Sequence, residues 1–321
     1  MKRFKLTVIP SLAAVGALMA LMFVVLASGT GSLGRIIHTQ NSLYNKIFVY
    51  QESSVRSLRF GKREPLIVQS RVDLANPRRH VHEYTTLAFA ALLYNPEPER
   101  ALVVGLGGGV IPRDLRHYFP DLKIDVAEID PAIPEIAKEY FLFETDEELT
   151  VHVKDGRVFV KRLLRREEVP QYDLIVLDAC TSEYIPFHLM TREYLEEVKG
   201  MLADDGVLVS NAIYSNRLAE AQFRTFETSF RRCQVYVGQR STNAMLVAPG
   251  AEVEPITPEE AAERAEKLQK EHEFAFDIRR VAGRLRPDLK PDPEAPILTD
   301  DRAPVNRLRH QDLPEGSDWS E

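Results

Sequence analysis

The chain has 321 residues, of which 44% are hydrophobic and 28% charged, and its formal net charge is −7. This length suits one large domain with additions, or at most two domains. The negative charge and the lack of a basic stripe argue against nucleic acid as a partner, because nucleic-acid binding depends on basic patches. The two cysteines, Cys180 and Cys233, are too few for a metal cluster or a disulfide framework.

Residues 1–28 differ in kind from the rest of the chain. Lys2, Arg3 and Lys5 precede an uncharged run, residues 6–27, that is long enough to span a bilayer as a helix. Two interpretations stay open: an uncleaved transmembrane anchor, and a signal peptide that is cleaved as the protein is exported. We favour the membrane anchor because the run is long for a signal peptide. The basic residues before it predict a cytoplasmic N-terminus and a domain on the far side.

Residues 41–75 predict a small antiparallel β-sheet. Runs rich in Val, Ile, Phe and Tyr occupy residues 46–50, 54–60 and 66–69, and residues 61–64 supply a turn. Residues 81–93 then show the apolar spacing of a helix, which ends before Pro96.

Residues 76–250 alternate between expected strands and helices. The expected strands are residues 101–104, 123–127, 149–153, 173–177 and 207–211, each followed by a helical segment, and residues 234–238 and 244–247 read as a closing hairpin. Such alternation predicts an α/β fold with a Rossmann-like, doubly wound, mostly parallel sheet of the methyltransferase type. Residues 251–321 are charged and proline-rich, and we expect a helical and partly disordered tail, with a helix at 258–270 and disorder in the last dozen residues.

A glycine-rich turn follows the first expected strand of this sheet. Gly105, Gly107 and Gly109 lie between the strand and a helix, where glycine lets the backbone approach a ligand and leaves helix N–H groups exposed. A tight strand-to-helix turn without a ligand is the alternative. Glu128, 23 residues beyond Gly105, ends the next strand and can accept hydrogen bonds from both ribose hydroxyls. Dinucleotide enzymes share this acid, but the turn lacks the third glycine of their fingerprint.

Two further acids end the next two strands. Asp155, followed by Gly156, can accept a hydrogen bond from the amino group of adenine, and its alternative role is to cap the following helix. Asp178 ends the fourth strand, where ligands of open α/β sheets bind. A carboxylate there can stabilise a nearby sulfonium and accept a proton from an attacking amine.

Taken in order, these motifs resemble the polyamine aminopropyltransferases, the spermidine synthase family. The similarity covers roughly residues 41–249 and rests on the glycine turn, A-E-I-D-P at 127–131, K-D-G-R at 154–157, Y-D-L-I-V-L-D at 172–178 and L-M-T-R-E-Y-L at 189–195. Residues 298–305 resemble the tail of spermidine-synthase-like domains that are fused to bacterial membrane segments.

The resemblance implies an aminopropyl transfer without a tightly bound cofactor. An amine would attack the carbon beside the sulfonium of decarboxylated S-adenosylmethionine, the co-substrate, and release methylthioadenosine. Glu128 would bind the ribose, Asp155 and Gly156 the adenine, and Asp178 would accept the proton, with His82 facing the substrate. A small-molecule amine and the adenosyl sulfonium are the implied partners. The N-terminal segment adds a membrane as a partner, and a homodimer stays open.

Several positions depart from the family pattern. Gly108 replaces an aspartate that contacts the donor's ammonium, and Thr181, at a substrate-binding position, replaces an aspartate for the acceptor amine. Each lost carboxylate removes a charge-assisted hydrogen bond of roughly 1.5–3 kcal/mol. Two alternatives therefore stay open: a methyltransferase that uses S-adenosylmethionine, and a non-catalytic nucleoside-binding or scaffold protein. Asp300 and Asp301 would replace the missing acids if the tail folded over the site.

Overall fold

The computed structural model describes residues 34–61, 67–180, 185–230, 232–313 and 319. The predicted anchor or signal segment, residues 1–28, lies outside these residues, and so does Thr181. Within the described part of the chain, no helix has the length and apolar character needed to cross a membrane.

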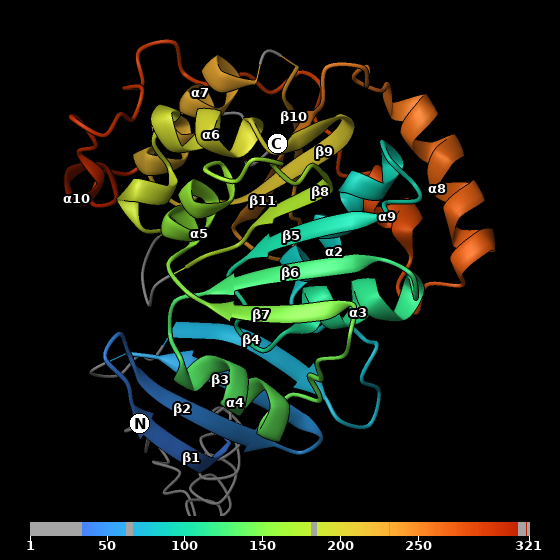
Figure 1. The fold of residues 1–321 in the computed structure, drawn as a ribbon, viewed down its shortest axis with the longest axis vertical. Coiled ribbons are helices and arrows are strands. Elements are labelled where there is room, and N and C mark those ends of the chain that lie inside the picture. Colours follow the sequence, from blue (N-terminus) through green and yellow to red (C-terminus); the bar gives the residue numbers. More distant parts are fainter. Residues whose placement is uncertain (1–33, 62–66, 181–184, 231, 314–318, 320–321) are drawn as a thin grey trace, which may run out of the picture.

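The N-terminal region is a four-stranded antiparallel sheet in the order β1 (Arg35–Asn41), β2 (Lys46–Glu52), β3 (Val55–Phe60) and β4 (Ile67–Asp73). Three of these strands were expected, whereas β1 was not, so the sheet begins earlier than the predicted residue 41. As an edge strand, β1 is mostly exposed and ends in polar residues, and it therefore lacks the apolar alternation that marks a half-buried strand. Figure 1 shows this sheet at the bottom of the molecule, below the central sheet.

The expected helix at residues 81–93 is wrong in its start and in its type. The α-helix α2 spans only Glu83–Leu87, and a 3₁₀ helix, η1, continues over Ala88–Leu93. All six residues of η1 are buried. Because this segment is enclosed by other elements, packing rather than the local pattern selects the tighter turn.

The central sheet has seven strands in the order β10-β11-β9-β8-β5-β6-β7. Five run parallel: β5 (Arg100–Val104), β6 (Lys123–Glu128), β7 (Leu149–Val153), β8 (Tyr172–Leu177) and β9 (Leu202–Ile213). The hairpin of β10 (Gln234–Val237) and β11 (Asn243–Pro249) adds two antiparallel strands. The predicted Rossmann-like α/β fold is confirmed, and its strand order reverses between β5 and β8, where such sheets bind ligands.

Helices cover both faces of this sheet. On one face α3 (Val110–Tyr118) and α4 (Ala132–Tyr140) contribute to a core with the N-terminal sheet. On the other face α5 (Gly156–Leu163), α6 (Arg192–Lys199) and α7 (Arg217–Ser229) build a second core, and a short 3₁₀ helix, η2 (Phe187–Leu189), precedes α6. Two cores on one sheet explain why the strand sequences are apolar on both faces.

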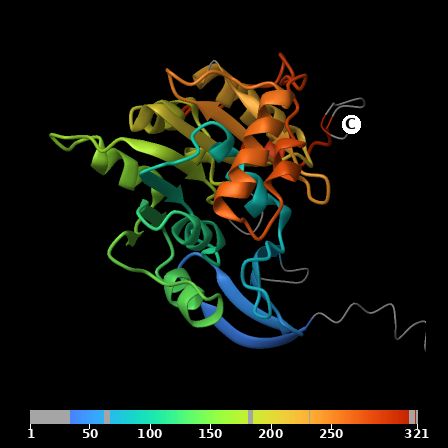
Figure 2. The ribbon, with the colours of Figure 1, turned by 90° about the vertical axis from the view of Figure 1, so that its right-hand side faces the viewer.

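The C-terminal region packs onto the same body. Helix α8 (Pro258–His272) begins with a capping box at Thr257 and buries Ala261, Ala265 and Leu268 in the core that contains η1. Helices α9 (Ile278–Ala282) and α10 (Val305–Leu308) follow, and Figure 2 shows α8 lying along the body on the side away from the N-terminal sheet.

Trp319 does not fit the disorder that we predicted for the last dozen residues. Its ring is buried and stacks on Tyr214, and its Nε1 donates a hydrogen bond of 2.6 Å to Glu220. One aromatic residue therefore fixes this position of the tail, which composition alone did not reveal.

Candidate active site

A cavity of about 1040 Å³ opens at the carboxyl ends of the parallel strands. Its walls come from the ends of β5, β6 and β8, from the N-terminal sheet and from residues of β9 and β11. Among the sequence-predicted residues, this cavity is lined by Gly105, Gly107, Glu128, Asp155, Gly156, Asp178 and His82. The fold thus brings together residues that lie up to 96 positions apart, from His82 to Asp178.

The glycine turn after β5 needs glycine for its backbone and for space. Gly105, Gly107 and Gly109 all have positive φ angles, of 99°, 54° and 71°. A Cβ on Gly105 would lie 2.6 Å from the carbonyl oxygen of Asp178. The turn therefore brings the ends of β5 and β8 into contact, and Gly109 starts helix α3.

Gly108 has a different reason to be glycine. A Cβ at this position would lie 2.6 Å from Oγ of Ser70, on β4, and 3.0 Å from the ring of Phe141. Ser70 itself is buried. The N-terminal sheet thus fills the space that a larger side chain at position 108 would need.

Glu128 is tied to the glycine turn. One of its carboxylate oxygens accepts a hydrogen bond from the backbone N–H of Leu106 and the other from that of Asp130, both at 2.9 Å. Burial raises the pKa of Glu128 above its ordinary value, and the backbone hydrogen bonds oppose that shift. Since a carboxylate has about four acceptor positions, two remain for a ligand's hydroxyl groups.

Asp155 does cap helix α5, because its Oδ1 accepts a hydrogen bond of 2.9 Å from the N–H of Val158. Its Oδ2 lies 2.8 Å from Nε2 of His188, on η2. The hydrogen bond from His188 is the largest cause of the lowered pKa of Asp155. The two contacts therefore orient the carboxylate of Asp155. The capping role that the sequence left open is confirmed, and Asp155 also lines the cavity, where it can meet a ligand.

Asp178 has the most perturbed carboxyl group of the cavity. Burial raises its pKa from 3.8 to about 7, although a hydrogen bond of 2.8 Å from Nδ2 of Asn211 opposes this shift. Burial is the main cause of the raised pKa values of Tyr84 and Cys180, and the charge of Asp178 adds to both shifts. A carboxylate with a pKa near neutrality is suited to accept and release protons.

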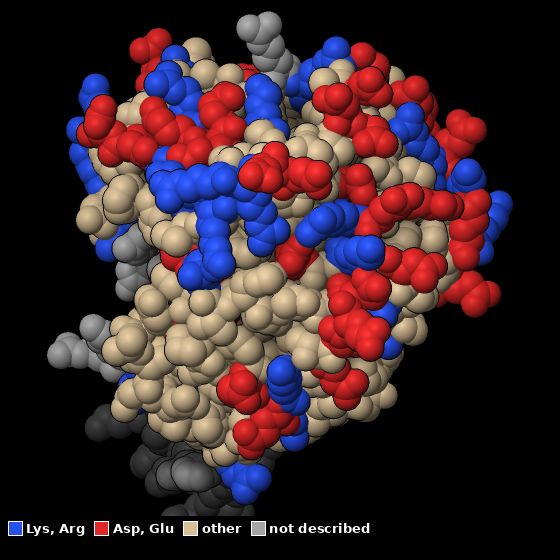
Figure 3. Space-filling model, in the orientation of Figure 1, with Lys and Arg blue, Asp and Glu red and all other residues tan. Residues whose placement is uncertain are grey.

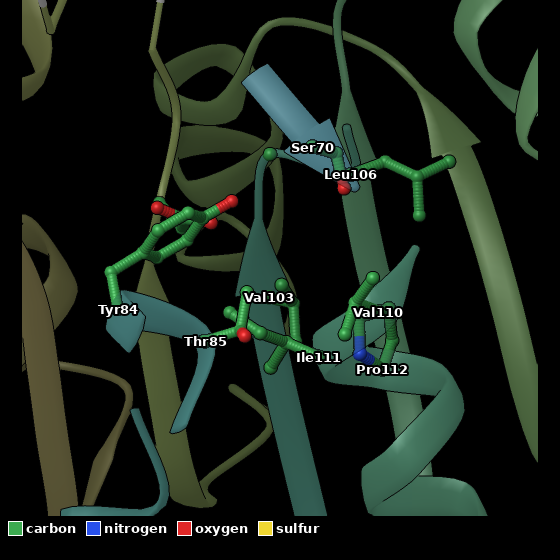
Figure 4. Close-up of a pocket in the computed structure, with 10 residues that line it drawn as sticks. Ser70, Tyr84, Thr85, Val103, Leu106, Val110, Ile111 and Pro112 are labelled. Atoms are coloured by element: carbon green, nitrogen blue, oxygen red, sulfur yellow. The ribbon is translucent and has the colours of Figure 1, made fainter. Parts of the chain in front are cut away.

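A small hollow lies behind Asp178, between β5, β4 and α2. Its volume of about 10 Å³ corresponds to about one water molecule. Figure 4 shows Ser70, Tyr84 and Thr85 around it, with Val103, Ile111 and Pro112 as its apolar side. The hydroxyl of Tyr84 donates to the carbonyl oxygen of Gln69 at 3.0 Å, so this ring is held in place between the two sheets.

His82 reaches the cavity from the residue before α2. Burial lowers its pKa to about 4, and the positive charge of Arg71 adds to the shift. Its Nε2 is buried and has no hydrogen-bond partner within the described part of the chain. The imidazole is therefore neutral near pH 7 and has one ring nitrogen free for a ligand.

The comparisons with known proteins agree with this geometry. A model of the spermine/spermidine synthase domain matches residues 81–245. A polyamine aminopropyltransferase of Vibrio vulnificus is 34% identical over 297 residues, which cover 91% of this chain and 97% of the relative. The chain belongs to the spermine/spermidine synthase domain family.

Two solved structures have a fold similar to that of this chain. A probable spermidine synthase from Corynebacterium glutamicum matches with a TM-score of 0.63 and 17% identity, over 87% of this chain and all of that one. Human methyltransferase-like protein 13, solved in complex with SAH, matches with a TM-score of 0.55 and 26% identity, over 61% of this chain and 93% of that one. The shared architecture is thus common to synthases and methyltransferases.

Asp300 and Asp301 do not replace the aspartates that the family has at the positions of Gly108 and Thr181. Asp300 binds the guanidinium of Arg157 with hydrogen bonds of 2.6 and 2.8 Å and accepts another from Thr191. The cavity walls include neither Asp300 nor Asp301. Arg157 follows Asp155 and Gly156 on α5, so Asp300 acts on the helix behind the cavity.

Several residues of the site were not predicted from the sequence, among them Tyr84, His188 and Asn211. Tyr84 follows the predicted His82 by two positions, which is the one local signal that could have pointed to it. His188 and Asn211 each lie 33 residues from the aspartate that they contact. Only the folded sheet brings these partners together.

Proposed function

We propose that this protein is an aminopropyltransferase that uses decarboxylated S-adenosylmethionine as donor and an amine as acceptor. The observation that carries the proposal is the position of Asp178, a half-buried carboxylate with a pKa near 7 at the end of β8, in a cavity that also contains Glu128 and Asp155. Membership of the spermine/spermidine synthase domain family supports the reaction type.

The nucleoside would bind along the ends of β6 and β7. Glu128 has acceptor positions for the two ribose hydroxyls, and Asp155 can accept from the adenine amino group. Ile129 lines the cavity beside Glu128 and is 37% exposed, so it offers apolar surface to the purine ring. These contacts would place the sulfonium near the glycine turn.

The reaction would be an in-line displacement. The lone pair of the amine attacks the methylene carbon beside the sulfonium, the carbon–sulfur bond breaks, and neutral methylthioadenosine leaves. Asp178 accepts the proton that the amine loses. An alkylammonium has a pKa of about 10, so a carboxylate at about 7 lowers the cost of proton transfer by about 4 kcal/mol relative to one with the ordinary value near 4.

Product analysis tests this proposal. Native protein and Asp178→Asn are incubated with decarboxylated S-adenosylmethionine and a panel of amines, and methylthioadenosine and aminopropylated amine are measured by mass spectrometry. We expect both products from the native protein and a loss of at least about a hundredfold in the variant. Absence of both products with every amine would contradict the proposal.

A methyltransferase is the second candidate, and one observation favours it. Ser70 fills the space beside Gly108, so this turn carries no acid to meet the donor's ammonium. Human methyltransferase-like protein 13 shares the fold. The same assay with S-adenosylmethionine separates the candidates, because methyl transfer would release S-adenosylhomocysteine in place of methylthioadenosine.

We also propose that residues 1–28 attach the protein to a membrane. The support is the apolar run after Lys2, Arg3 and Lys5. Carbonate extraction of membranes tests attachment, and protease protection of the C-terminus tests the side on which the domain lies. An external domain would speak against the transferase, since adenosyl sulfonium donors are made in the cytoplasm.

A further inference from the structure

His188 pairs with Asp155 at the cavity wall, and the proposed function gives His188 no role. Nε2 of His188 lies 2.8 Å from Oδ2 of Asp155, while Oδ1 accepts from the N–H of Val158. Both side chains are partly exposed, 33% for His188 and 22% for Asp155, and both residues line the cavity. Each oxygen of the carboxylate thus has one donor, which fixes its orientation toward the cavity.

The backbone of His188 is itself held from behind. Arg157 donates from Nη1 to the carbonyl oxygen of His188 at 3.4 Å, and the same guanidinium binds Glu197 and Asp300. The N–H of Arg192 donates to the carbonyl oxygen of Leu298, so residues 298–300 are fixed to the start of α6. The C-terminal segment therefore stabilises the turn that carries His188.

The cavity wall that contains this pair also has apolar residues, which suit a flat, apolar ring. Ile129, Pro186 and Leu189 line the cavity with the pair. Figure 3 shows few charged side chains over the middle of the face seen in Figure 1, around β7, and basic side chains gathered over α5 above it. The carboxylate of Asp155 is then the polar group that meets one edge of such a ring.

We propose that His188 is a positioning residue that makes the site select 6-aminopurines over 6-oxopurines. This inference rests on the proposed nucleoside site. His188 and Val158 both donate to Asp155 and so favour its ionised form, which presents only lone pairs to the ligand. Such a group accepts a hydrogen bond from an exocyclic amino group and repels an exocyclic oxygen. Without the donor at position 188, the carboxylate turns more freely and discriminates less.

Binding of two nucleosides to the full chain tests the proposal. Methylthioadenosine and methylthioinosine are titrated calorimetrically into the native protein, His188→Phe and His188→Gln. Phe keeps a ring beside Phe187 but removes the N–H donor, whereas Gln restores a donor. We expect the native preference for the adenine compound to fall by about tenfold in His188→Phe, the worth of one hydrogen bond to a charged group, and to recover in His188→Gln.

His152→Ala is the matched control. His152 lies 2.7 Å from Asp125 and is 34% exposed, so it resembles His188 in pairing and exposure, but it does not line the cavity. Its loss should leave the preference unchanged. An unchanged preference in His188→Phe would overturn the proposal while leaving the nucleoside site intact. No binding of either nucleoside by the native protein would instead overturn the proposed function as well.

Discussion

Replacing Asp178 by Asn should stabilise the protein at alkaline pH. The pKa of Asp178 is about 7 in the folded protein against 3.8 for the free group, so the folded state holds this proton more tightly than the unfolded state. Stability is therefore lost as the pH rises from about 4 to about 7, and the full cost applies above pH 7. The difference in pKa corresponds to about 4 kcal/mol, an upper value for a side chain that is partly exposed.

Asparagine removes the buried charge and keeps an acceptor for Asn211. Denaturant unfolding of the native protein and Asp178→Asn should show a gain of about 2–4 kcal/mol for the variant at pH 8 and no difference at pH 4. The same variant should lose turnover, which separates stability from catalysis. A variant that is equally or less stable at pH 8 would show that Asp178 is not desolvated, and its role as a base would lose its physical support.

Three further results are expected. The rate of transfer should rise with pH through about 7, because Asp178 accepts a proton only when ionised; a profile that is flat between pH 6 and 8 would contradict this. Gly105→Ala should cost more than about 2 kcal/mol in denaturant unfolding, since φ is 99° and the new Cβ meets Asp178, whereas Gly283→Ala, with its nearest contact at 3.6 Å, should be neutral. Turnover of putrescine by the native protein should be weak or absent in a product assay. The double variant Ser70→Gly/Gly108→Asp should raise this turnover, because the first change frees the space that the second needs. Strong turnover by the native protein would show that other groups hold the diamine.

The central sheet and the acids at its edge were predictable because buried parallel strands have sequences that are continuously apolar. Glu128, Asp155 and Asp178 each follow such a run, and the carboxyl ends of parallel strands meet at one edge. The sequence could therefore place these residues together before any contact was known. For Asp155 the sequence left two roles open, a helix cap and a ligand contact. The structure shows that Asp155 caps α5 and also lines the cavity.

The remaining features depend on contacts between distant segments. The pairs His188–Asp155 and Asn211–Asp178 join different strand ends, and Ser70 meets Gly108 only because the N-terminal sheet packs on the glycine turn. No local pattern encodes such contacts. The exposed strand β1 and the buried 3₁₀ helix η1 escaped prediction for opposite reasons, too little apolar patterning in the first and apolar residues on every side in the second.

Calorimetric titration with methylthioadenosine is the decisive measurement, because the aminopropyltransferase, the methyltransferase and the role of His188 all require an adenosyl site at the carboxyl edge of the sheet. Glu128 is the residue to change, since its carboxylate has positions for both ribose hydroxyls. We predict binding to the native protein and loss of at least about tenfold in affinity in Glu128→Ala. No binding to the native protein would show that the cavity is not an adenosyl site, and equal binding by Glu128→Ala would show that Glu128 does not hold the ribose.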